Sequence, residues 1–184
     1  SAGGSYGSGT LFKATAQGTI TTLYNFSAAP ANASGLEINS EGAFPVSGIL
    51  AGNDGTLYGG TVFGGSNGTG SLFSLAPDNT LTTLYQFSSL SSGINSDGAG
   101  VTSTPMRASD GNLYGVTTLG GTNGDGVIYK LTMPALPTVT LTLGSTQISS
   151  GGSTLLSWSS SGASTCSATG GWSGTQATSG SISV

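Results

Sequence analysis

Aspartates beside glycines are the first residues of this sequence that could do chemistry. Four aspartates directly precede a glycine, namely Asp54, Asp97, Asp110 and Asp125. The stretches around Asp97 and Asp125 faintly resemble calcium loops, since carboxylate oxygens bind Ca²⁺. A calcium cage needs about six to eight oxygen ligands, and no segment offers three carboxylates at loop spacing. Because Asp-Gly also forms tight hairpin turns, we expect turns here, with Asp97 and Asp125 as weak calcium candidates and no other cofactor.

The sequence offers little for catalysis. Glu37 and Glu41 stand in one long loop, and a carboxylate pair can cleave a glycosidic bond, but exposed loop glutamates are usually only solvated. The chain has no histidine, which removes the usual general base. Lys13 and Lys130 fall in expected strands, so neither is placed to activate a serine. We therefore expect a protein that is not an enzyme.

Aromatic side chains recur at matching positions along the chain. They are Tyr24, Phe26, Tyr58, Tyr85, Phe87 and Tyr114. Recurrence of this kind is typical of packing between structural repeats. The same rings could instead stack on saccharides, as they do in carbohydrate-binding propellers. Tyr58 and Tyr114 are therefore the ligand candidates if the protein binds glycans.

These residues are positioned by an internal repeat, which is the strongest signal in the sequence. Three motifs recur in the same order: Gly-Thr-Leu-Phe at 9–12, matched at 70–73 and loosely at 126–129; Thr-Thr-Leu-Tyr-x-Phe at 21–26 and 82–87; and Asp-Gly-x-Leu-Tyr-Gly at 54–59 and 110–115. The repeat units cover about 3–63 and 64–119, with a partial unit at 120–133.

Each unit is predicted to contain four short antiparallel strands, at 10–15, 20–26, 46–51 and 57–63 in the first unit. Four strands in about 50 residues are typical of a β-propeller blade. We therefore expect an all-β, propeller-like fold with two full repeats plus one strand of a third. That extra strand, at 127–132, could close a blade across a repeat boundary.

The motifs resemble the GloVer tandem repeats of bacterial secreted and surface-anchored proteins, the choice-of-anchor tandem repeat family. The resemblance covers about residues 3–132, and Asp-Gly-Asn-Leu-Tyr-Gly at 110–115 is its most specific part. It implies export, attachment to the cell envelope and a propeller-like blade, and it implies no enzymatic activity.

Beyond the repeats, residues 134–137 form a predicted proline linker, and 138–184 resemble the first half of an immunoglobulin-like sandwich. Strands are expected at 139–143, 154–158 and 163–168, with Cys166 on the last, followed by the motif Gly-Trp-Ser-Gly at 171–174. A complete sandwich has about seven strands, and a later strand would carry a cysteine to pair with Cys166.

Both regions should leave unpaired strand edges. The chain is either an excerpt of a longer array or a protomer completed by strands from neighbouring chains. If chains complete one another, the candidate assembly residues are Val127, Ile128, Tyr129 and Cys166.

Charge narrows the possible partners. Three basic and seven acidic residues give a net charge of -4. So few cations cannot neutralise a run of phosphates, so we expect no nucleic-acid partner, and the same argument excludes an anionic membrane surface. No apolar stretch reaches the roughly 20 residues of a membrane span. We expect a non-enzymatic, extracellular structural or adhesive protein of the bacterial surface that self-associates. The alternative is a carbohydrate-binding propeller that recognises surface glycans.

Overall fold

The computed structural model describes residues 2–135, 137–170 and 173–184. These residues form strands and turns with no helix among them, which confirms the expected all-β class. Accordingly, no helix in these ranges is long and apolar enough to cross a bilayer. The chain divides into two compact units, Ser1–Met133 and Pro134–Val184. Leu136 of the predicted linker and Gly171 and Trp172 of the Gly-Trp-Ser-Gly motif lie outside the described residues.

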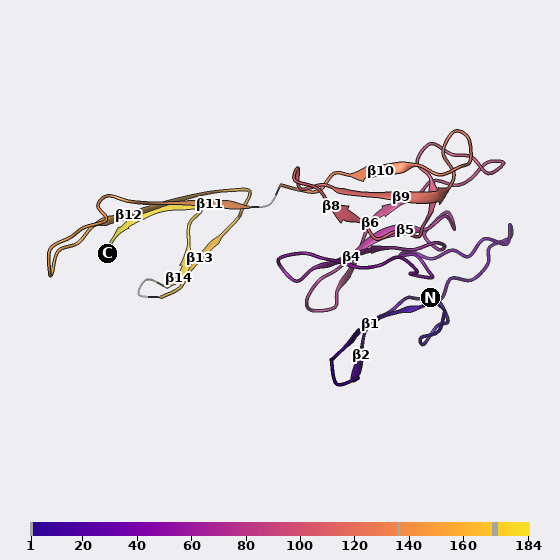
Figure 1. The fold of residues 1–184 in the computed structure, drawn as a ribbon, viewed down its shortest axis with the longest axis horizontal. Helices are drawn as coiled ribbons and strands as arrows, with labels where there is room; N and C mark the ends of the chain where they lie inside the picture. Colours follow the sequence, from indigo (N-terminus) through magenta and orange to yellow (C-terminus); the bar gives the residue numbers. More distant parts are fainter. Residues whose placement is uncertain (1, 136, 171–172) are drawn as a thin grey trace. The chain divides into compact units, whose positions relative to one another are not determined.

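The described residues of the first unit form three antiparallel sheets (Figure 1). Its strands are β1 (Thr10–Ala14), β2 (Ile20–Asn25), β3 (Leu50–Ala51), β4 (Leu57–Gly60), β5 (Ser71–Leu75), β6 (Leu81–Gln86), β7 (Ala99–Val101), β8 (Met106–Arg107), β9 (Leu113–Leu119) and β10 (Ile128–Leu131). The first sheet is the β1–β2 hairpin, and the middle sheet has the order β3-β4-β5-β6. In the last sheet β9 lies between β10 and β7, and β8 also pairs with β9.

The sheets straddle the repeat boundaries. We expected the four strands of one repeat to form one blade, and this prediction is wrong: β4 pairs with β5 of the next repeat. The reason is the length of the connections. Residues 61–70 join β4 to β5 directly, whereas the longer loop 26–49 separates β2 from β3. The last strand, β10, does pair across a boundary as expected, with β9 of the preceding repeat.

The third strand of each repeat is shorter than predicted. In the first repeat it covers only Leu50–Ala51, because a side chain replaces part of the ladder. The Ser47 hydroxyl donates to the Gly60 carbonyl at 3.0 Å and accepts from the Gly60 N–H at 2.9 Å. Ser103 stands in the same relation to Val116 in the second repeat.

Two apolar cores lie on opposite faces of the middle sheet. Adjacent residues of a strand point to opposite faces, so Phe73 enters one core and Leu72 the other. The first core, between the first and middle sheets, is built from Leu11, Leu23, Tyr24, Phe26, Leu57, Phe73, Leu75 and Leu81. The second core, between the middle and last sheets, is built from Leu72, Leu84, Phe87, Val101, Tyr129 and Leu131. Most of the recurring aromatic side chains therefore pack between sheets.

The second unit contains two smaller antiparallel sheets, of order β11-β12-β15 and β13-β14. Its strands are β11 (Thr138–Leu143), β12 (Leu155–Ser161), β13 (Cys166–Ala168), β14 (Gly174–Gln176) and β15 (Ser179–Ser183). Trp158 is the one buried hydrophobic residue in the described part of this unit, and its indole N–H donates to the Ala177 carbonyl at 2.9 Å. Cys166 is a free, half-buried thiol, 3.4 Å from the Ser160 hydroxyl.

Candidate functional site

Asp97 and its repeat counterpart Glu41 hold loops in place. Asp97 accepts hydrogen bonds from the Tyr85 hydroxyl at 2.7 Å, from the Ser88 N–H at 3.0 Å and from the Ser88 hydroxyl. Burial opposes ionisation of Asp97, but the bonds from Ser88 and Tyr85 outweigh it and leave its pKa below the usual value. Glu41 accepts in the same way from the Tyr24 hydroxyl at 2.6 Å and from the Ser27 N–H. Burial and the Glu41 carboxylate together raise the pKa of Tyr24 to about 12.

An asparagine two residues before each carboxylate completes this loop bracket. The Asn39 amide donates to the Ser27 and Gly42 carbonyls at 3.2 and 2.8 Å, and its oxygen accepts from the Gly42 and Gly65 N–H groups at 2.7 and 2.9 Å. Asn95 makes the equivalent four contacts in the second repeat, at distances from 2.8 to 3.0 Å. These side chains tie the long loop to the glycine pair that precedes the next strand.

The other acidic candidates, Asp54, Asp110 and Asp125, lie in turns or in a loop. Asp54 accepts from the Thr56 N–H at 3.1 Å and Asp110 from the Asn112 N–H at 3.1 Å, as expected for hairpin turns. Asp125 forms a bridge with Gly120 in the loop before β10. Over the described ranges, Asp97 and Asp125 are not part of any group of three or more His, Cys, Asp or Glu residues that could hold a metal ion.

The two ligand tyrosines occupy different environments. Tyr58 is buried, with the Arg107 guanidinium 5.1 Å from its ring centroid, so in this structure its ring is not open to a sugar. Tyr114, at the same position of the last sheet, is half-buried. Its hydroxyl donates to Asp110 at 2.8 Å, and Lys130 lies 5.6 Å from its ring centroid.

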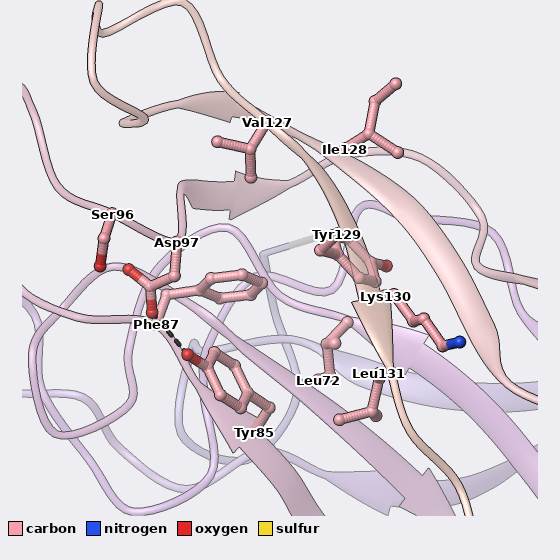
Figure 2. A pocket seen from close by; sticks show the side chains of 10 residues that line it. All are labelled: Leu72, Tyr85, Phe87, Ser96, Asp97, Val127, Ile128, Tyr129, Lys130 and Leu131. Carbon is pink, nitrogen blue, oxygen red and sulfur yellow. Dashed lines mark hydrogen bonds between the residues drawn. The ribbon is translucent and has the colours of Figure 1, made fainter.

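The predicted assembly residues Val127, Ile128 and Tyr129 line an open groove of about 390 Å³ (Figure 2). Figure 2 shows β10 crossing above the side chains that the middle sheet and its loop contribute. The full lining is Leu72, Tyr85, Phe87, Ser96, Asp97, Val127, Ile128, Tyr129, Lys130 and Leu131. The fourth assembly candidate, Cys166, lies in the second unit and lines a separate pocket with Trp158.

One of the residues that line this groove, Tyr129, carries a buried hydroxyl. Tyr129 occupies the repeat position of Phe73, and its ring packs edge-on against Phe87 with centroids 5.9 Å apart. Within the described chain the Tyr129 hydroxyl is buried without a hydrogen-bond partner, and burial raises its pKa to about 12. An unpaired buried hydroxyl is unfavourable, so β10 fits its place less well than β5 fits the middle sheet.

The comparisons with known proteins identify the repeat. A family model described as the Gloeobacter/Verrucomicrobia repeat matches residues 1–178. The chain belongs to the Gloeobacter/Verrucomicrobia repeat family. The GloVer resemblance expected from the sequence is thereby confirmed, and the match extends past residue 133 into the second unit. A search of curated proteins finds no match.

In this Gloeobacter/Verrucomicrobia repeat chain, the asparagine–carboxylate bracket is the feature that sequence reasoning missed. The signal was present, since Asn-x-Glu at 39–41 and Asn-x-Asp at 95–97 stand at equivalent positions of the two repeats. It was hidden because the loop before it differs in length between the repeats and because glutamate replaces aspartate. The bracket uses both carboxylates for structure.

Proposed function

We propose that this chain is a non-enzymatic structural or adhesive protein of the bacterial cell surface, and that its repeat sheets associate with those of neighbouring copies. One observation carries the proposal: apolar side chains at both ends of the repeat array are exposed where their repeat counterparts are buried. Phe12 is 59% exposed and Phe73 0%, while Ile128 is 81% exposed and Leu72 3%. Exposed apolar positions of this kind mark interaction surfaces.

Membership of the family and the composition support the surface location. The GloVer resemblance implies export, and a surface with 5% charged residues relies on neutral hydroxyl and amide groups for its hydration. Asp97, Glu41, Asp54 and Asp110 all accept structural hydrogen bonds, so these four acidic residues are committed to loops and turns.

The proposal includes the arrangement of both units. The sheets of the first unit stack face to face around shared cores, which supports a propeller-like array. The second unit places Trp158 and Cys166 around one pocket between antiparallel sheets, which supports an incomplete immunoglobulin-like module. The self-association we propose uses main-chain pairing and apolar packing and requires no cofactor.

The proposal is tested by measuring the mass of the particles that the protein forms and by determining where in the cell the protein lies. Light scattering over a wide concentration range, with negative-stain electron microscopy of the same sample, should show rings or filaments whose mass is a multiple of 17.9 kDa. Antibodies against the chain should label intact cells of a bacterium that produces it. A single-chain mass at every concentration would overturn the assembly role, and labelling only after lysis would overturn the surface location.

The alternative, a carbohydrate-binding protein, depends on Tyr114. Its ring is only partly buried, and a partly exposed aromatic ring is a surface on which a saccharide can stack. A glycan array separates the two functions. Reproducible binding that Tyr114→Ala abolishes, and that Tyr6→Ala leaves intact, would favour the alternative; no binding in any protein would eliminate it.

A further inference from the structure

The first and last sheets contain complementary parts of the middle sheet. In the middle sheet, two inner strands, β3 and β4, are joined to two outer strands, β5 and β6. The first sheet has only the outer pair, and no described strand pairs with the inner edge of β1. The last sheet has the inner strands β8 and β9 but only β10 in the outer half.

The β1–β2 hairpin is built like β5–β6. Leu11 pairs with Tyr24 and Phe12 with Thr22, and a register shift separates these two pairs. In the middle sheet Leu72 pairs with Tyr85 and Phe73 with Thr83, with the register shift at the same place. The hairpin therefore already has the shape needed beside a strand of the β4 type, and β9 is such a strand, since Leu113 and Tyr114 repeat Leu57 and Tyr58.

The groove beside β10 marks where an outer strand is absent. In the first core, Leu81 of β6 packs with Leu75 and Phe73. Their counterparts Leu131 and Tyr129 line the groove, but no described residue takes the place of Leu81. The residue of the hairpin that corresponds to Leu81 is Ile20, which is 67% exposed.

Polar groups around the groove repeat this pattern. In the middle sheet the Ser40 carbonyl accepts from Thr83 Oγ1 at 3.2 Å and from Gln86 Nε2 at 3.4 Å. The repeat counterpart of Ser40 is Ser96, which lines the groove and has no hydrogen-bond partner within the described residues. The hairpin carries the matching donors, the Thr22 hydroxyl and the Asn25 amide, and the Asn25 oxygen accepts from the Ser5 N–H of its own copy at 3.1 Å.

The geometry points to strand exchange between copies: the β1–β2 hairpin of a second copy replaces β10 and completes the last sheet as β8-β9-β1-β2. This inference rests on the proposed self-association and names its surface and its partner. The hairpin brings Phe12 to the place of Tyr129, where a phenyl ring leaves no hydroxyl unpaired. It brings Lys13 to the place of Lys130, which pairs with Asp110 at 3.1 Å.

We take the partner to be a second copy because the β1–β2 hairpin of the same copy is already packed in the first core. The last sheet contributes to the second core, on the opposite face of the middle sheet, through Val101, Tyr129 and Leu131 (Figure 1). The hairpin of a second copy carries the same Thr-Thr-Leu-Tyr sequence, at 21–24, as β6 does at 82–85. Each contact joins one end of a copy to the other end of the next, which produces rings or filaments.

The decisive experiment locks β10 in place in the full chain. Val116 and Ile128 are directly opposite on β9 and β10, at a separation that a disulfide can span. We expect Val116→Cys with Ile128→Cys, in a Cys166→Ser background, to remain a single chain when oxidised and to assemble when reduced, as followed by light scattering. The Cys166→Ser protein should assemble under both conditions.

A second variant tests the other end. Phe12→Lys changes a residue that is exposed in the single chain, but it would place an ammonium group in the second core of the neighbouring copy. The concentration for half-assembly should rise more than about tenfold. Val139→Lys, at a 61% exposed position of the second unit, is the matched control and should assemble normally.

The outcomes separate this inference from the proposed function. If the oxidised lock assembles as readily as the reduced protein, or if Phe12→Lys has no effect, strand exchange is wrong and the copies associate through another surface. If the unmodified chain never assembles at any concentration, the proposed self-association fails together with the exchange.

Discussion

The middle sheet and the last sheet are built from the same motifs and reach different states. Leu72 and Phe73 of β5 are both buried, because a sheet covers each face of the middle sheet. Their counterparts on β10 are Ile128, the most exposed of the large hydrophobic residues described, and Tyr129, whose buried hydroxyl has no described partner. A repeat motif therefore specifies a strand, while its neighbours decide whether that strand is core or surface.

The largest difference in stability that we expect between matched positions is between Phe73 and Phe12, which occupy the same position of successive repeats. Phe73→Ala removes a fully buried ring that lies 5.3 Å from Phe26, so the free energy of unfolding should fall by about 3 to 5 kcal/mol. Phe12→Ala, at a 59% exposed position, should change it by less than about 0.5 kcal/mol in dilute solution. Urea unfolding of both variants checks this, and similar losses would show that Phe12 is also covered.

The asparagine bracket should matter equally on both sides of the middle sheet. Asn39→Ala and Asn95→Ala each leave backbone groups of Gly42 or Gly98 without their partner, so each should cost about 2 kcal/mol. Urea unfolding of the two variants at neutral pH gives the measurement. A much smaller loss for Asn95→Ala would mean that the loop of the second repeat is held by other contacts.

Tyr129 of β10 and Phe73 of β5 occupy the same repeat position, and exchanging tyrosine for phenylalanine at each tests how well the two strands fit their cores. Tyr129→Phe removes a buried hydroxyl without a described partner, so it should raise the free energy of unfolding by about 1 kcal/mol. Phe73→Tyr places a hydroxyl at the fully buried position and should lower it by at least as much. Thermal unfolding of both proteins would contradict this if Tyr129→Phe were the less stable one.

The smallest effect concerns pH. The hydrogen bonds from Ser88 and Tyr85 hold the pKa of Asp97 below its unfolded value of about 3.9. The stability that the carboxylate contributes is therefore present above that value and lost as the pH falls through the folded pKa. Because solvent screens this group, the contribution should stay under about 1 kcal/mol.

Asp97→Asn is the variant that isolates this contribution. It should be slightly less stable than the unmodified chain at pH 7, and the difference should shrink as the pH falls below the unfolded pKa of about 3.9 and through the lower folded pKa. Unfolding free energies measured across this range provide the check. A difference that stays constant with pH would show that the carboxylate's charge plays no part.

Local structure was largely predictable from the sequence. Asp54 and Asp110 form the expected turns, and strands begin within a residue of the expected positions at Thr10, Ile20 and Leu57. The pairing of β4 with β5 was not predictable from motif boundaries. A sequence repeat can be divided into units at any point of its period, so it does not show where one sheet ends and the next begins. The burial of Tyr58 under Arg107 was also hidden, since it needs the last sheet to lie against the middle one.

The sequence by itself determined the strands, the turns and the family, because alternating apolar residues and Asp-Gly pairs act over a few residues of chain. Only the tertiary structure decided which hairpins share a sheet, that Glu41 and Asp97 brace loops, and that Phe12, Ile20 and Ile128 are exposed. The physical reason is that burial and strand pairing depend on what covers each face and edge. In a repeat array each unit is covered by the neighbouring units. Identical motifs therefore differ in burial wherever no described neighbour covers them.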